Sequence, residues 1–140
     1  MSTRSDLKTY LESKSTITAV VSTRIFGVKR PQKIRTLPAI TFERMNGGHD
    51  HTLSAAAGSA IPRFRIRCWA ATYVAADALA EILRNVMQGY RGTMGSTTVQ
   101  SVILDDEFDE YEESEDGSDQ GVFGIAHDYL IRYVESVPTL

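Results

Sequence analysis

The chain has 140 residues and a formal net charge of −3, and 42% of its residues are hydrophobic while 24% are charged. These values exclude a chain that is disordered throughout, and they predict a single domain, residues 1–140, built around one core. The apolar runs fall short of the roughly 18 residues that a membrane-spanning helix needs, and the single cysteine, Cys68, excludes an internal disulfide.

The N-terminal third of the chain predicts two short helices, a basic connection and a strand. Apolar residues recur at helical spacing over residues 5–13, and residues 15–22 favour a second short turn of helix. Residues 24–38 are basic and are interrupted by glycine and proline, which is typical of a long loop. The strand is expected over residues 39–45. The first 15 residues lack the apolar stretch of a signal peptide, so we expect a reducing, intracellular site of synthesis.

The middle of the chain predicts a second strand and the longest helix. After a glycine-rich link over residues 46–62, the strand alternates arginine with apolar residues, which places two sets of side chains on opposite faces. The expected core set is Phe64, Ile66 and Cys68, and the expected outer set is Arg63, Arg65 and Arg67, with Trp69 beside them. The following helix is expected to begin after Thr72, to bury Leu79 and Ile82, and to end before Gly89.

The C-terminal part of the chain predicts two strands joined by an acidic turn. Residues 98–111 are apolar at first and acidic later, residues 112–121 are expected to form a mobile hairpin tip, and residues 122–134 predict the last strand. The expected fold is α+β with the order α-β-β-α-β-β. It is a mostly antiparallel sheet of about four strands, arranged as two hairpins and packed against two main helices.

Charge is distributed unevenly along the chain. Residues 1–67 contain 12 Lys and Arg against 4 Asp and Glu, whereas residues 68–140 contain 3 against 14, and ten of these acids lie between Asp105 and Asp119. Three arginines in a row on one strand face repel each other, so we expect carboxylates to meet them. Free duplex DNA fits poorly because the chain is acidic overall. A protein surface rich in carboxylates, such as the chain's own acidic half, fits better.

Few residues suggest catalysis or metal binding. His49, Asp50 and His51 have side chains that bind zinc or nickel, but neighbours on a glycine-rich loop rarely all point inward, and a polar turn is favoured. Asp105 and Asp106 have the chemistry of a cation site or of a general acid and base, yet a solvated face is favoured in so acidic a segment. Phosphate-loop and nucleophile-elbow motifs are absent from the sequence. We therefore expect no catalytic residue, no metal site and no cofactor.

The favoured site is a surface for another protein. Its candidate residues come from the arginine strand and the acidic strand: Arg63, Arg65, Arg67, Trp69, Asp105, Asp106, Asp109 and Glu110. Opposite charges on these two strands favour a contact between different patches of two copies, in which the arginines of one copy meet the acids of the next. Cys68 and His127 are expected to be structural, in the core or at an interface.

Five segments, taken in order, resemble one family of proteins. They are "RIFGVKRPQKIRTLPAITFERM", "HTLS", "RFRIRCWAATYVAADALAEILRNVMQGYRG", "SVILDDEFDEYEE" and "FGIAHDYLIRYVE". In their order and spacing these segments resemble the tail-completion, or tail-terminator, family of long-tailed bacteriophages and related gene transfer agents. The similarity covers nearly the whole chain, and its most specific part is the segment with "WAATY" and "ALAEILR", followed by the strand with "HDYLIRY".

The resemblance implies an antiparallel-rich sheet with helices, and a ring, typically a hexamer, at the head-proximal end of a tail tube. A protein in that position stops polymerisation of the tail tube protein and offers a surface to the head–tail connector or adaptor. DNA passes through its channel without specific binding. The implied location is the virion, after synthesis in the cytoplasm of a host bacterium and with no membrane partner. The implied role is structural and not enzymatic.

Two other functions stay open on the sequence alone. One is a head–tail adaptor of the same particle, which forms a ring but binds the portal instead of the tail tube. The other, less favoured, is a small metal-dependent enzyme that uses His49, His51 and the acids. Bound metal in the purified protein would favour the enzyme.

Overall fold

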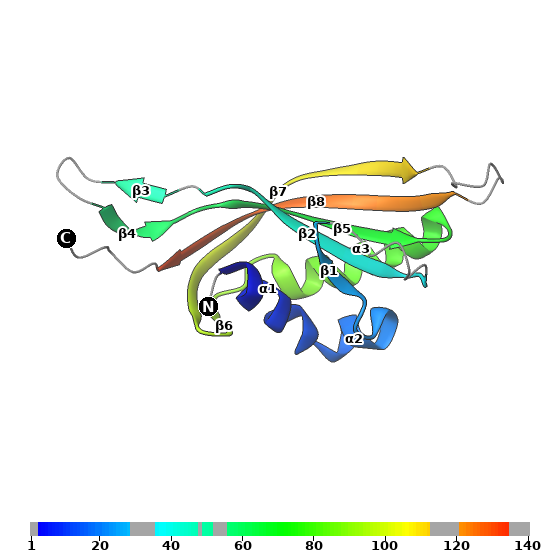
Figure 1. Cartoon of the computed structure of the whole chain (residues 1–140), viewed down its shortest axis with the longest axis horizontal. Helices are drawn as coiled ribbons and strands as arrows, with labels where there is room; N and C mark the ends of the chain where they lie inside the picture. The colour runs from blue at the N-terminus through cyan, green and yellow to red at the C-terminus, as the bar shows by residue number, and fades with distance from the viewer. Residues whose placement is uncertain (1–2, 29–35, 48, 52–55, 113–120, 135–140) are drawn as a thin grey trace.

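The computed structural model describes residues 3–28, 36–47, 49–51, 56–112 and 121–134, and for residues 3, 49–51 and 56–59 it describes the backbone alone. The helices are α1 (Thr3–Glu12), α2 (Ser15–Val21) and α3 (Tyr73–Met87). The strands are β1 (Ile25–Gly27), β2 (Ala39–Asn46), β3 (His49–His51), β4 (Ala56–Ala60), β5 (Arg63–Ala70), β6 (Gly92–Met94), β7 (Thr97–Glu112) and β8 (Val122–Val134). Figure 1 shows the three helices together on one face of a long sheet.

Strand β8 is the centre of the sheet. Its residues from Phe123 to Leu130 pair with β5 on one edge and with β7 on the other. Strand β4 continues the β5 edge by pairing with Tyr133 and Val134 at the end of β8. Beyond these, β2 pairs with β5, β3 pairs with β4, and β6 pairs with the start of β7. Strand β1 lies outside β2 and runs parallel to it, whereas the pairs just named are antiparallel.

The expected four-stranded antiparallel sheet with two main helices is wrong. The described residues form eight strands in one mixed sheet, together with three helices. The four expected strands are β2, β5, β7 and β8, and the two expected hairpin pairs form, but β5 also pairs with β8 and joins them. The additional strands β1, β3, β4 and β6 have three to five residues and no clear alternation of apolar and polar residues. They form because a longer neighbour pairs with their backbone, which the sequence pattern does not reveal.

The core lies between the helices and one face of the sheet. Strand β5 contributes Phe64, Ile66 and Cys68, as its alternation predicts, and all three are buried in one cluster with residues of the three helices. Residues 113–120, where most of the mobile hairpin tip is expected, lie outside the described residues. Most buried apolar residues of the described part of the chain form one cluster.

Helix α3 has the expected ends and packs on β5, β7 and β8. The Thr72 hydroxyl accepts a hydrogen bond from the Ala75 backbone N–H at 3.2 Å, which makes Thr72 the N-cap. Gly89 has a φ of +78°, the left-handed conformation that commonly follows a helix. Leu79 is 1% exposed, whereas Ile82 is only partly buried against the core. Among the described residues, no helix combines the length and apolar character that a membrane crossing requires.

Candidate subunit interface

The arginine strand lies on the face of the sheet opposite to the helices, called here the open face. The side chains of Arg63, Arg65 and Arg67 alternate with the buried core residues of β5, so they point away from the helices. Strand β5 lies between β2 and β8, which places Arg65 opposite Glu43 on one side and opposite Asp128 on the other. The fold therefore brings carboxylates of the same chain within reach of the arginines.

Asp128 is the most buried member of this arrangement. Its side chain is 1% exposed and accepts hydrogen bonds from Arg65 Nε at 2.8 Å, from Arg65 Nη2 at 3.0 Å and from Arg63 Nε at 2.9 Å. Burial by itself raises the pKa of Asp128, but hydrogen bonds from Arg65 and Arg63 outweigh it and hold the pKa below its ordinary value. Asp128 is therefore an ionised, fully paired carboxylate within the sheet.

Arg67 is held between two glutamates from different strands. Its Nη1 donates to Glu43 Oε1 on β2, and its Nε lies 2.9 Å from Glu110 Oε2 on β7. These side chains keep 19–27% of their exposure, so each pair is accessible to water and salt. Pairs of this kind contribute about 0–1 kcal/mol each.

The acidic strand β7 supplies two further contacts on the open face. Asp105 lies at the register shift between β7 and β8, and its carboxylate pairs with Arg63 Nη1. The guanidinium of Arg65 lies over the Phe108 ring, with 4.7 Å between its central carbon and the ring centroid. This position allows a cation–π interaction in addition to the ion pair with Asp128.

Small residues in β8 let the side chains of β5 and β7 meet across it. Ala126 lies between Arg67 and Phe108 in the register, and Gly124 lies between Trp69 and Glu110. A larger side chain at either position would stand between the two strands. The contact between Arg67 and Glu110, which belong to strands that do not pair directly, depends on this spacing.

Trp69 extends the open face as a buried side chain and not as an exposed anchor. It is 6% exposed, and its Nε1 donates a hydrogen bond to Thr41 Oγ1 at 3.0 Å. The ring covers Gly124, because a Cβ at this glycine would lie 2.6 Å from the ring atom Cζ3. Trp69 therefore stabilises the sheet locally and presents little of its surface to a partner.

Only some of the predicted interface residues contact one another in the structure. Arg63 and Arg67 pair with Asp105 and Glu110 inside one chain, as described above. Asp106 instead accepts a hydrogen bond from the Glu107 backbone N–H at 2.9 Å, and Asp109 accepts one from the Tyr73 hydroxyl of α3 at 3.1 Å. The repulsion within the arginine row is thus relieved by the chain's own acids. Contact of these residues with a second copy stays a prediction.

Asp128 and Glu43, two carboxylates that meet the arginines of the open face, are not among the candidates expected from the sequence. Asp128 stands in a largely apolar strand, and a buried carboxylate there requires a cationic partner. The apolar context of Asp128 thus indicates that it needs a cationic partner, but it does not identify that partner. The partners follow from the strand order β2-β5-β8, which alternation within single strands does not predict.

Strand β7 also presents an edge for pairing. Its partner β6 pairs with Thr97, Thr98 and Val99 only, so among the described residues no strand covers the outer edge from Gln100 to Glu112. This exposed edge carries six carboxylates. Charges of one sign on an edge strand disfavour pairing with the same strand of another copy.

The candidates for metal binding and catalysis stay unsupported within the described residues. No group of three possible metal ligands occurs among them. The backbone of His49, Asp50 and His51 forms β3, but their side chains lie outside the described part of the chain. Cys68 is fully buried, which raises the pKa of its thiol.

His127 is a buried histidine on the helix side of the sheet. It is 3% exposed, its Nδ1 lies 2.9 Å from the Tyr129 hydroxyl, and its Nε2 lies 3.3 Å from Glu107 Oε2. Burial lowers the pKa of His127, and the nearby Glu107 offsets this only in part. The imidazole is therefore neutral near neutral pH, and it fills a structural position.

Comparison with known proteins identifies a shared fold. The chain matches no family model and no curated protein. Among solved structures it is similar to a chain of the virion of a native gene transfer agent particle, with 15% sequence identity, a TM-score of 0.68 and a match that covers 89% of each chain. At this level of identity the likeness concerns the fold alone. The whole arrangement of sheet and helices, and not one motif within it, is therefore shared with that virion chain.

Proposed function

We propose that this chain is a structural virion protein, a tail terminator that forms a ring at the head-proximal end of a tail tube. The ring, typically of six copies, ends growth of the tube and joins it to the head connector. The observation that carries the proposal is the fold shared over 89% of both chains with a component of a gene transfer agent virion. The five ordered segments that resemble tail terminators are a second, independent support.

The charged surfaces suit a head-to-tail ring better than a symmetric dimer. The acidic edge of β7 repels the same edge of another copy, so it favours contact with a different, basic patch. Contacts between two different patches generate rings when the rotation between copies closes. Negative charge also keeps passing DNA from adhering to the ring, because phosphate binding needs Lys and Arg.

Removal of the gene from the particle's genome tests the role. We expect tails that are overlong or lack heads, because tube growth is no longer stopped and the connector has no surface to bind. Expression of the wild-type chain in trans should restore normal tails. Tails of normal length that are joined to heads in its absence would rule out the terminator role.

Binding partners separate the terminator from a head–tail adaptor of the same fold. A terminator binds the ends of purified tail tubes, and an adaptor binds the portal ring. Electron microscopy of the purified protein mixed with each assembly distinguishes the two. The proposal assigns no catalytic residue, metal or cofactor to this chain, and stoichiometric bound metal in the purified protein would contradict that assignment.

A further inference from the structure

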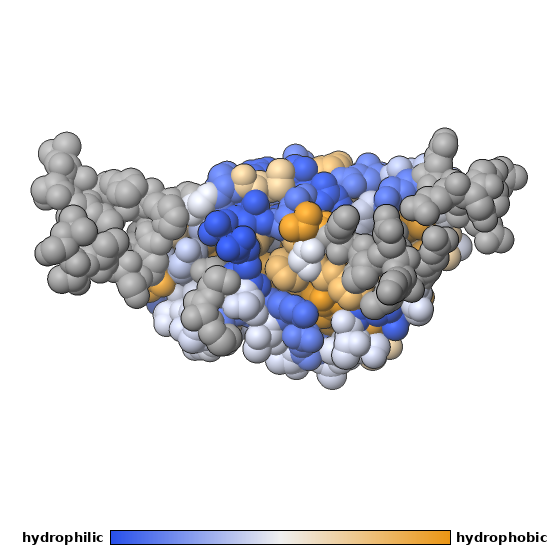
Figure 2. All heavy atoms as spheres, in the orientation of Figure 1, coloured by the Kyte–Doolittle hydropathy of each residue, from blue (hydrophilic) through white to orange (hydrophobic). Residues whose placement is uncertain are grey.

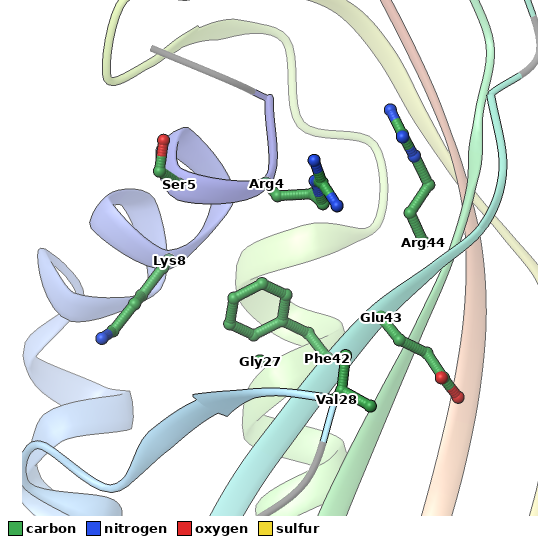
Figure 3. A pocket seen from close by; sticks show the side chains of 8 residues that line it. All are labelled: Arg4, Ser5, Lys8, Gly27, Val28, Phe42, Glu43 and Arg44. Carbon is green, nitrogen blue, oxygen red and sulfur yellow. The ribbon is translucent and has the colours of Figure 1, made fainter.

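A groove lies between α1 and the β1–β2 edge, on the opposite side of β2 from the arginine strand. Its volume is about 510 Å³. It is lined by Arg4, Ser5 and Lys8 of α1, by Gly27 and Val28 at the end of β1, and by Phe42, Glu43 and Arg44 of β2. Figure 3 shows Arg4 and Arg44 reaching into the space above the Phe42 ring from opposite walls, while Glu43 points away. The groove is thus a cationic channel over an apolar floor.

The cations of this groove differ from those of the open face because they are not neutralised. Within the described part of the chain, Arg4, Lys8 and Arg44 form no ion pair, whereas the Glu43 carboxylate is engaged by Arg67. Figure 2 shows hydrophobic surface in the region of β1, where Val28 is 65% exposed, with hydrophilic residues beside it. Such a surface fits a peptide that carries several carboxylates.

We propose that this groove binds the acidic segment 105–119 of a second copy of the chain. That segment carries ten carboxylates in 15 residues, five of them from Glu112 onward, and it has the highest density of negative charge in the sequence. The inference rests on the proposed ring and specifies one of its contacts. Carboxylates of one subunit meet Arg4, Lys8 and Arg44 of the next.

The ordered acids of β7 do not reach the groove cations of the same chain. In the register Phe42 pairs with Ile66, Ile66 with His127 and His127 with Glu107, so three strand spacings separate β2 from β7. At about 4.8 Å per spacing this is roughly 14 Å, which is too far for a direct ion pair across the sheet. A contact of these cations with the acids of β7 is therefore made between two copies, head-to-tail, the kind that closes a ring.

A carboxylate-rich peptide fits the groove better than nucleic acid does. The chain is acidic overall, so a long DNA duplex meets repulsion from its other acidic surfaces, whereas a short acidic segment contacts the groove alone. A second copy brings its acids on a strand that is already ordered as far as Glu112, which lowers the entropic cost of binding. Nucleic acid is therefore treated as a competing outcome in the test.

The first test measures the groove alone. The acceptor is the full chain with Glu112→Gln, Glu113→Gln and Glu115→Gln, which weakens its own acidic segment. The probe is a labelled peptide of residues 109–119, "DEYEESEDGSD", followed by fluorescence anisotropy. We expect salt-sensitive binding that is weakened about tenfold or more by Arg4→Glu with Arg44→Glu. The matched control, Arg84→Glu with Arg91→Glu, reverses two exposed arginines elsewhere and should leave binding unchanged.

The second test exchanges charges between copies. A groove variant carries Arg4→Glu and Arg44→Glu, and a segment variant carries lysine at all five acidic positions from Glu112 to Asp119. Each variant alone places like charges where residues 112–119 meet the groove, so neither should form rings. An equimolar mixture places opposite charges at these contacts and should restore rings in which the two variants alternate. Native mass spectrometry identifies them by their composition.

The outcomes separate this inference from the proposed function. Wild-type rings together with unaffected rings of both variants would overturn the groove contact and leave the ring intact. Wild-type chains that form no ring, even on tube ends, would overturn the ring, while the peptide titration would still decide whether the groove recognises acids. Binding of a DNA duplex that depends on Arg44, without binding of the peptide, would overturn the proposed occupant.

Discussion

Arg65 and Asp128 form a two-point ion pair across the junction of β5 and β8. Arg65 Nε lies 2.8 Å from Oδ1 of Asp128, and Arg65 Nη2 lies 3.0 Å from Oδ2. The carboxylate is 1% exposed and the arginine side chain 22% exposed. A planar guanidinium matches a carboxylate in this geometry, so the pair fixes the orientation of both side chains. The other charged side chains of the open face lie around this ion pair.

Removal of the Asp128 carboxylate should destabilise the fold. In Asp128→Ala, Arg65 loses both of its hydrogen-bond acceptors there and Arg63 loses one, while the two cations stay close together. We expect a loss of about 3 kcal/mol in the free energy of unfolding, near the lower end for opening a buried ion pair, because both arginines keep some contact with water.

Urea denaturation at neutral pH measures this loss. The control is Asp106→Ala on the adjacent strand, where an exposed carboxylate is removed and a change within about 0.5 kcal/mol is expected. Equal effects of the two substitutions would show that the ion pairs of Asp128 with Arg63 and Arg65 have no special role in stability.

His127 should make the stability depend on pH in the weakly acidic range. Its pKa in the folded chain lies below the ordinary value of 6.5, because burial disfavours the charged imidazole. The unfolded chain therefore binds a proton more readily as pH falls through 6.5, and stability that is present above this pH is lost below it. The slope contributed by one such group is at most about 1.4 kcal/mol per pH unit.

The comparison of wild type with His127→Gln isolates this contribution. The wild-type free energy of unfolding should fall more steeply between pH 7 and pH 5 than that of the variant, since both chains share all other titrating groups. Parallel curves for the two chains would mean that the His127 pKa is the same in the folded and unfolded states.

Leu79 tests the buried face of α3. Its side chain is 1% exposed in the core, so Leu79→Ala should cost about 2–5 kcal/mol through lost burial and the cavity left behind. Val74 on the same helix is 77% exposed, and Val74→Ala should change the free energy of unfolding by less than about 0.5 kcal/mol. A change of that small size in Leu79→Ala would show that the helix buries another face.

Gly124 tests the packing of the open face. An added methyl group would lie 2.6 Å from the Trp69 ring. The ring cannot move freely because it is buried and hydrogen-bonded to Thr41. Gly124→Ala should therefore cost about 1–3 kcal/mol.

Gly27→Ala is the matched control for this substitution. A Cβ at Gly27 meets Phe42 at an ordinary 3.8 Å, so a much smaller effect is expected. Chemical denaturation that ranks the two substitutions in the opposite order would contradict the placement of Trp69.

Local patterns predict the elements that carry their own signals. The alternation from Arg63 to Ala70 predicts both the strand β5 and its buried face, and Thr72 and Gly89 predict the ends of α3. The strand over residues 122–134 has the predicted bounds. In each case the residues that determine the element lie within the element or at its ends, so its sequence pattern is enough to predict it.

Features that depend on neighbours in space are not predictable from such patterns. The short strands β3 and β4 form where the sequence reads as a glycine-rich link, because their backbones pair with each other and with the end of β8. The partners of the arginines follow from the position of β8 between β5 and β7 and from the small residues Gly124 and Ala126. The sequence therefore predicts that the arginines need acids, but not that those acids belong to the same chain.

The native mass of the purified chain, alone and mixed with purified tail tubes, tests the central proposal most directly. The account predicts closed rings, typically hexamers, that are seen by native mass spectrometry or by electron microscopy at one end of each tube. Raised salt should weaken these rings, because charged surfaces contribute to the contact. A chain that stays monomeric at low salt and also in the presence of tube ends would contradict the account.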